Sequence, residues 1–152
     1  MSAGLERQFV DTNILVYAHD LSAGNKNVQA GRLLEELWET GQGCLSIQVL
    51  QEFYVTVTRK VPRPLAVAKA TQIIADLGCW HVHTPDVADI LRAIDIQQEN
   101  KISFWDALIL RSALALECKV VWSEDLNCGQ IYGEVKVLNP FVDFGCATGE
   151  EK

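Results

Sequence analysis

The chain has 152 residues, of which 49% are hydrophobic, and this is the size and apolar content of one compact domain with a single core. At this length a fold buries roughly 70% of the surface of its unfolded chain, so neither disulfides nor a structural metal are needed for stability. The net charge of −7 argues against a broad basic surface for nucleic acid. A cation held by several acids would offset part of that charge where a substrate lies, and an acidic chain also suits a basic protein partner.

The five cysteines form no metal or redox motif, because no two of them have the C-x-x-C spacing. Their odd number indicates a reducing compartment. The first seven residues lack the basic and apolar regions of a signal peptide, and no apolar run approaches the roughly 18 residues of a membrane span. We therefore expect a soluble, cytoplasmic protein that does not contact a membrane.

Residues 8–18 predict a strand, a turn and a helix. An apolar run typical of a strand is interrupted at Asp11-Thr12-Asn13, and apolar residues then resume at helical spacing. Asp11 thus follows a buried strand directly, and in open α/β sheets ligands bind at that edge. After a turn at 22–25, the spacing of apolar residues predicts an amphipathic helix that ends near Gly41.

A second strand is predicted over 43–46, followed by a helix over 47–60 with Ser46 as its N-cap. The predicted core stripe of this helix consists of Ile47, Leu50, Tyr54 and Val57. Glu52 lies at the border of that stripe, where it can turn towards the sheet edge or towards water.

Pro62 and Pro64 break this helix, and a further helix over 65–77 makes a helical hairpin with it. The hairpin carries the densest positive charge of the chain, in Arg59, Lys60, Arg63 and Lys69. This charge is compatible with a solvated face and with contacts to a phosphate backbone.

A third strand is predicted over 80–83, followed by a helix that Pro85 opens. His81 and His83 share a face of this strand, as metal ligands sometimes do. No third ligand lies near them in the sequence, so we favour packing or hydrogen bonding at the sheet edge.

The segment 103–116 predicts the central buried helix, because apolar residues go nearly all round it. Asp106 is its only acid before Glu117. Ser103 and Asp106 have the spacing of a capping box. A cap alone does not explain why an acid, with its burial cost, lies between Trp105 and Ala107.

Two more strands are predicted over 119–122 and 135–138, and Asp125 lies in the loop that follows the first of them. The piece between Gly129 and Gly133 is expected to be irregular or helical. Residues 143–152 have no pattern, and we expect a flexible C-terminal tail there.

Short strands that alternate with helices specify a mostly parallel five-stranded sheet with helices on both faces. Asp11 and Asp125 lie just past strands at one edge, and Glu52 and Asp106 lie early in helices that start from it. Carboxylates within about 4 Å repel by roughly 4 kcal/mol per pair at an effective dielectric near 20, so such a cluster needs protons or a cation. Oxygen ligands favour Mg²⁺ or Mn²⁺, and such a site suits phosphoryl transfer or phosphodiester hydrolysis.

Four short motifs in this order resemble the acidic motifs of PIN-domain ribonucleases. They are Val10-Asp11-Thr12-Asn13, Val49-Leu50-Gln51-Glu52-Phe53, Phe104-Trp105-Asp106-Ala107-Leu108 and Trp122-Ser123-Glu124-Asp125-Leu126-Asn127. With the ending Asn139-Pro140-Phe141, residues 8–142 are most similar to VapC-type toxins of toxin–antitoxin pairs.

The resemblance implies a single PIN-like nuclease domain over residues 1–142. It implies an endoribonuclease that depends on one or two Mg²⁺ or Mn²⁺ ions, is held inactive by a VapB-type antitoxin and is usually a homodimer. By the same resemblance, the acids that bind metal and catalyse are Asp11, Glu52, Asp106 and Asp125, with Asn13 and Ser123 as hydrogen-bonding support. Asn127 stands where some relatives have a further acid.

Three other functions are compatible with parts of the pattern. A phosphatase of the haloacid dehalogenase type needs D-x-D after the first strand, but position 13 is Asn. A receiver-like signalling domain needs an Asp at the end of a middle strand, and the third strand ends at His83 without one. A PIN fold that only binds RNA or protein would not need all four acids.

Overall fold

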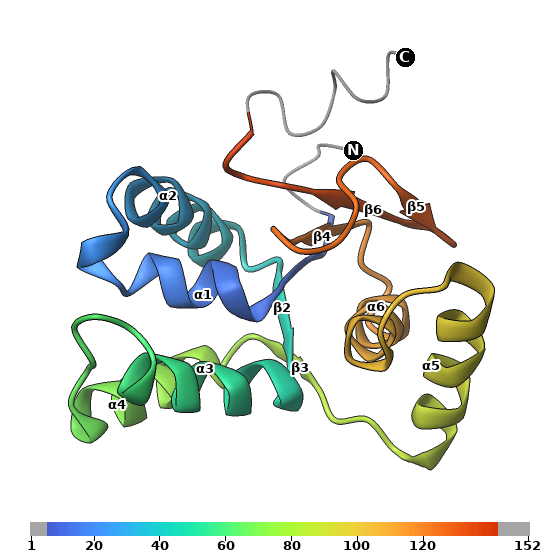
Figure 1. Ribbon diagram of the computed structural model, residues 1–152, viewed down its shortest axis with the longest axis horizontal. Coiled ribbons are helices and arrows are strands. Elements are labelled where there is room, and N and C mark those ends of the chain that lie inside the picture. The colour runs from blue at the N-terminus through green and yellow to red at the C-terminus, as the bar shows by residue number, and fades with distance from the viewer. Residues whose placement is uncertain (1–5, 143–152) are drawn as a thin grey trace.

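The computed structural model describes residues 6–142 and contains a six-stranded sheet between two groups of helices (Figure 1). The strands are β1 (Gln8–Val10), β2 (Gly43–Ser46), β3 (His81–His83), β4 (Val120–Trp122), β5 (Ile131–Tyr132) and β6 (Val135–Leu138). Their order in the sheet is β3-β2-β1-β4-β6-β5, and every pairing is parallel except that of β5 with β6. The predicted α/β class is confirmed.

The predicted count of five strands was wrong by one, because β5 lies in the piece expected to be irregular or helical. A two-residue strand is too short to show a period in the sequence. The chain reverses after it at Gly133, whose φ of +62° is open to glycine without strain. Tyr132 then pairs with Val135.

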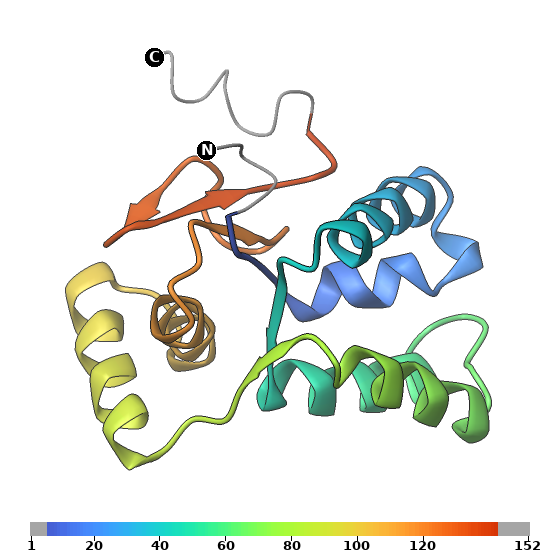
Figure 2. The same cartoon turned by 180° about the vertical axis from the view of Figure 1, so that it is seen from behind.

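The six α-helices are α1 (Thr12–Ala18), α2 (Asn25–Thr40), α3 (Ile47–Arg59), α4 (Val67–Leu77), α5 (Val87–Asn100) and α6 (Phe104–Ala115), and a 3-10 helix, η2 (Leu21–Ala23), precedes α2. Helices α1 to α4 lie together on one side of the strands, and α5 and α6 lie on the other (Figures 1 and 2). Across residues 6–142, no helix has the length and apolar content to cross a membrane. The predicted tail 143–152 lies outside the described residues.

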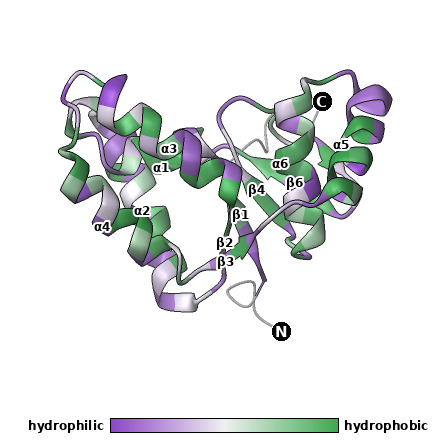
Figure 3. Cartoon of the chain, turned by 90° about the horizontal axis from the view of Figure 1, so that it is seen from below, coloured by the Kyte–Doolittle hydropathy of each residue, from purple (hydrophilic) through white to green (hydrophobic). Residues whose placement is uncertain are grey.

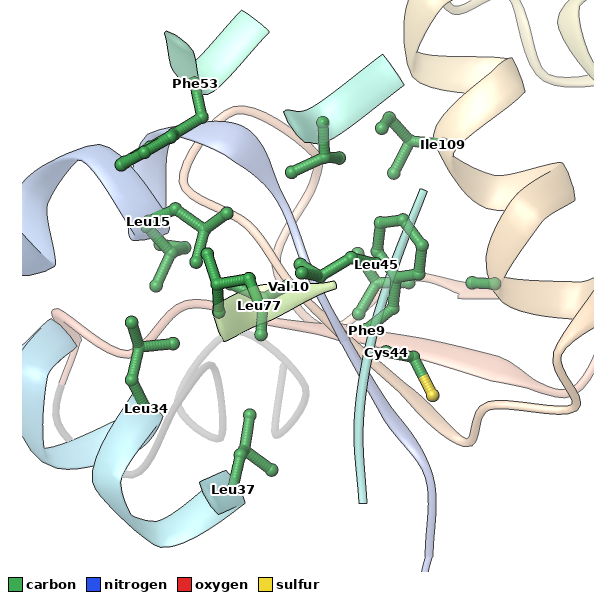
Figure 4. Packing of buried hydrophobic residues seen from close by; sticks show 14 of the residues in the cluster. Phe9, Val10, Leu15, Leu34, Leu37, Cys44, Leu45, Phe53, Leu77 and Ile109 are labelled. Atoms are coloured by element: carbon green, nitrogen blue, oxygen red, sulfur yellow. The ribbon is translucent and has the colours of Figure 1, made fainter. Parts of the chain in front are cut away.

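Side chains of the central strands alternate between the two groups of helices. Phe9 pairs in register with Cys44, which puts them on the same face as Ser46 and its partner His83. His83 hydrogen-bonds Ser112 of α6, so this face packs on α6. The opposite face meets apolar residues from α1 to α4, which include Leu15, Leu34, Leu37, Phe53 and Leu77 (Figure 4).

Helix α3 buries half of the predicted stripe, Leu50 and Val57, together with Val49 and Phe53 of the neighbouring strip. Val49, Phe53 and Val57 are fully buried, whereas Ile47 and Tyr54 are only half-buried. Helix α1 and α4 both pack on α3, so the helix turns the predicted border strip inwards. The predicted N-cap is confirmed, since Ser46 Oγ accepts a hydrogen bond from the Val49 N–H (3.3 Å).

The two histidines of β3 make hydrogen bonds, as predicted. His81 Nε2 lies 3.3 Å from the Gly41 carbonyl, and His83 lies between Ser112 (2.8 Å) and the Asp89 carboxylate (3.2 Å). Three cysteines, Cys44, Cys79 and Cys118, are free thiols.

Candidate active site

Asp11 lies where β1 ends and is the N-cap of α1. Its Oδ1 accepts a hydrogen bond from the Thr12 N–H (2.7 Å), and its Oδ2 accepts one from the Ser123 hydroxyl (2.9 Å). The side chain is only 7% exposed. Both carboxylate oxygens are therefore held in a fixed orientation at the carboxyl edge of the sheet.

Ser123 connects the ends of β1 and β4. The Ser123 hydroxyl is fully buried, donates to Asp11 and accepts from the N–H groups of Asp125 and Leu126 (both 3.2 Å). The Asp125 carboxylate in turn accepts from the Asn13 side-chain amide (2.7 Å). Asn13 and Ser123 thus each donate a hydrogen bond to one of the four acids.

Glu52 and Asp106 approach from the two neighbouring helices. The Thr12 hydroxyl donates to Glu52 Oε1 (2.8 Å), and the Gln48 amide donates to Glu52 Oε2 (3.3 Å). Asp106 lies in the first turn of α6, where its N–H donates to the Ser103 hydroxyl (3.0 Å). The reciprocal bond to the Ser103 N–H is not formed in the described chain, so the predicted capping box is only half made.

All four acids line one cleft of about 320 Å³ between α3 and α6. Figure 3 shows these helices on either side of the ends of β1 and β4. A larger hollow of about 690 Å³ lies elsewhere, beside Arg92 and Lys119, and none of the four acids lines it. The smaller cleft is therefore the candidate active site, because the predicted chemistry converges there.

The acids in the cleft act on one another electrostatically. Burial raises the pKa of Asp11 from its ordinary 3.8 to about 6, and the charges of Asp106 and Asp125 add to that rise. Hydrogen bonds from the Thr12 N–H and Ser123 lower the same pKa without reversing the rise. Burial also raises the pKa of Asp106, with smaller contributions from Asp125 and Glu52. A proton or a cation would relieve this repulsion.

The donor set of the cleft fits a hard divalent cation. Its charged ligands are all carboxylate oxygens, and Mg²⁺ needs only one or two of these in direct contact because it keeps several waters. As the side chains of residues 6–142 stand, no group of three or more His, Cys, Asp or Glu is close enough to hold an ion. Glu52 and Asp125 are exposed, so their side chains have room to turn towards one.

The sequence analysis gave no role to Glu124, which anchors the loop that carries Asp125. The Tyr17 hydroxyl donates to its Oε1 (2.8 Å), and Lys26 pairs with its other oxygen. Lys26 also lies over the rings of Tyr17 and Phe141. These contacts hold the Asp125 loop against α1 and α2. Only its place beside Asp125 could have indicated this role.

The four basic residues of the helical hairpin do not lie together at the cleft. Lys60 lines it, beside Thr56 and Trp105. Arg59, Arg63 and Lys69 are exposed and line none of it.

Comparison with known proteins agrees with this architecture. The pattern of the PIN domain family matches residues 9–134. No curated protein matches the chain. A toxin–antitoxin complex from Klebsiella pneumoniae has a similar structure, with 20% sequence identity, a TM-score of 0.65, and coverage of 88% of this chain and 98% of that one. VapC20 of Mycobacterium tuberculosis, a toxin that cleaves the sarcin–ricin loop, has 17% identity, a TM-score of 0.58, and coverage of 78% and 89%. At these identities the likeness to the two solved structures bears on the fold alone. The PIN domain pattern, in contrast, covers most of the sequence. The chain therefore belongs to the PIN domain family.

Proposed function

We propose that this protein is a metal-dependent endoribonuclease that hydrolyses phosphodiester bonds in RNA, and that it is the toxin of a VapBC-type pair. The observation that carries the proposal is the convergence of Asp11, Glu52, Asp106 and Asp125 on one cleft of a PIN fold. The two similar structures lend support, since one is a toxin–antitoxin complex and the other a toxin that cleaves an RNA loop. Such a toxin acts on RNA in the cytoplasm.

In this proposal Asp11, Asp106, Asp125 and Glu52 hold one or two Mg²⁺ or Mn²⁺ ions. When bound, the metal offsets charge on the phosphate and activates the attacking water. Asp11 offers a fixed oxygen, because Thr12 and Ser123 restrain it. Glu52 Oε2 accepts only a 3.3 Å hydrogen bond from the Gln48 amide, and in this proposal that oxygen would accept a proton from the attacking water.

The direct test is to incubate the purified protein with mixed cellular RNA and to map new ends. We expect discrete cleavage with Mg²⁺ or Mn²⁺, no cleavage with EDTA, and recovery when excess Mg²⁺ is added. Cleavage that persists in EDTA would contradict the metal dependence. Binding without cleavage under every condition would favour a PIN fold that only binds RNA.

Phosphate contacts are proposed for the hairpin residues Arg59, Lys60, Arg63 and Lys69. Replacing Arg59 and Arg63 by Gln should weaken binding to all RNAs about equally, because phosphate contacts carry no sequence information. The slope of log affinity against log salt concentration should fall by the equivalent of up to about two phosphate contacts. Affinity can be measured in EDTA between about 50 and about 200 mM salt. Lys119→Gln, at the opposite end of β4 from the cleft, is the control. An unchanged salt slope in the double variant would assign Arg59 and Arg63 to a solvated surface.

A homodimer is proposed from the outer face of α5. Val87, Ile90, Leu91 and Ile94 recur at the spacing of one helical stripe and are 71%, 40%, 59% and 39% exposed. A second copy of this stripe would cover it symmetrically. Sedimentation at micromolar concentration should show a dimer, which Leu91→Asp converts to a monomer and Val67→Asp, on α4, leaves intact. A wild-type protein that sediments as a pure monomer would contradict this proposal.

The antitoxin is proposed to use a second apolar surface, a hollow of about 460 Å³ on α3 and α4. Ile47, Leu50, Tyr54 and Val55 contribute to its lining. An apolar helix face fits such a groove, and a basic partner suits a chain of net charge −7. Adding this partner should stop the RNA cleavage described above.

A further inference from the structure

Trp105 is a large apolar side chain exposed at the rim of the acidic cleft. It is 60% exposed, the most of any aromatic side chain in residues 6–142, and it lines the cleft directly beside Asp106. Leaving so large an apolar group in water loses the stabilisation that burial would give. Its position therefore calls for an explanation other than packing in the core.

The Trp105 indole belongs to a rigid part of the chain. It lies in the first turn of α6, which Ser103 caps. The Phe104 ring packs on it nearly perpendicularly, with 5.2 Å between the ring centroids, and Phe104 itself packs on the buried cluster of Ala93, Ala107 and Leu108. A braced aromatic ring of this kind presents a flat apolar face at little cost in conformational entropy.

The negative charge of the cleft favours RNA contacts that do not depend on charge. Four carboxylates line it, and Lys60 is the one Lys or Arg among its lining residues. An RNA strand is repelled by this set until a cation binds, so a contact that does not depend on charge would contribute affinity next to the reacting phosphate. Stacking on an aromatic ring is such a contact, because every base has a π-face.

We propose that Trp105 stacks on the base of an unpaired nucleotide beside the cut, and so restricts cleavage to single-stranded or looped RNA. This inference rests on the proposed nuclease function. A base inside a duplex is already stacked and cannot reach the indole, whereas an unpaired base can turn out onto it. Lys60, which lines the same cleft from the end of α3, would contact a phosphate of the same strand.

The test is RNA cleavage by three variants at saturating Mg²⁺. Trp105→Ala and Trp105→Leu should raise KM for a single-stranded substrate by about 10-fold, the scale of one stacked base, and Trp105→Phe should keep most of the affinity. Trp38→Ala is the matched control, since Trp38 is 46% exposed but packs on Trp80 away from the cleft. Thermal unfolding should stay near that of the wild type for all the Trp105 variants.

A substrate with an abasic nucleotide at the cut separates stacking from a structural role. Removing the base should weaken RNA binding by the wild-type protein. It should not weaken RNA binding by Trp105→Ala any further, because the base and the indole form one interaction, which that variant already lacks. If Trp105→Leu binds like the wild type, or if the abasic penalty is unchanged in Trp105→Ala, stacking is overturned. Stacking would also be overturned if the Trp105 variants changed the oligomeric state and nothing else, because Trp105 would then be an interface residue. These outcomes differ from failure of the proposed function, in which the wild-type protein itself does not cut RNA.

Discussion

Replacing Asp106 by Asn should abolish RNA cleavage and leave the fold intact. The carboxylate is a metal ligand in the proposed site, and losing one well-placed electrostatic group typically lowers kcat by roughly 10²–10³-fold. The fold should survive because Asn has nearly the same shape and because the helix cap uses the Asp106 N–H, which the substitution keeps. Cleavage of single-stranded RNA at saturating Mg²⁺ measures the loss.

Two further measurements make this result interpretable. In EDTA the Asp106→Asn variant should unfold at the same temperature as the wild type or higher, because burial and nearby acids already disfavour the charge, as the raised pKa of Asp106 shows. Glu39→Gln removes an exposed acid of α2 and should cleave normally. If Asp106→Asn cut RNA at the wild-type rate, Asp106 would not belong to the site.

The positions of the acids could be predicted because they follow from local sequence. Asp11 and Asp125 come directly after apolar runs that read as buried strands, and parallel strands end at one edge. Once both strands are parallel neighbours, the convergence of their loops needs no further information. The structure pairs β1 with β4 in that way.

What could not be predicted depends on tertiary packing. Residues 86–89 and 103–106 both offer an acid three positions after a helix cap, yet only Asp86 and Asp89 form the complete capping box. The Asp86 N–H, aided by Arg111, lowers the pKa of Asp89 to about 2, whereas burial raises that of Asp106. The same spacing thus gives a structural acid and a candidate catalytic one, and only the neighbours contributed by other elements distinguish them.

The buried stripe of α3 could not be predicted either, because it too depends on tertiary packing. Its apolar residues occupy two adjacent strips, and the sequence does not say which strip the sheet and α1 will cover. The covered strip contains Val49 and Phe53, and this choice sets Glu52 at the cleft beside Thr12. The other strip, with Tyr54 and Val55, becomes the apolar hollow that we assign to the antitoxin.

Without metal, Asp11→Asn should stabilise the protein at neutral pH. The pKa of Asp11 is about 6 in the folded chain, against 3.8 for an ordinary Asp, so the folded state binds more protons than the unfolded state between these values. Stability from this group therefore increases as the pH falls from about 6 towards 4, and at pH 7 and above the ionised carboxylate carries its full cost. That cost is about 3 kcal/mol, since one pKa unit corresponds to about 1.4 kcal/mol.

We expect the free energy of unfolding of Asp11→Asn in EDTA to exceed that of the wild type by about 1–3 kcal/mol at pH 7.5, with most of the gain lost at pH 4.5. Chemical denaturation at the two pH values measures it. Asp20, which is equally buried but outside the cleft, provides the control, and Asp20→Asn should not stabilise the protein. With Mg²⁺ the wild type should become more stable than Asp11→Asn, because Mg²⁺ binds only the folded wild type and stabilises it by mass action. A variant less stable than the wild type at pH 7.5 in EDTA would show that the hydrogen bonds to Asp11 outweigh the cost of burying its charge.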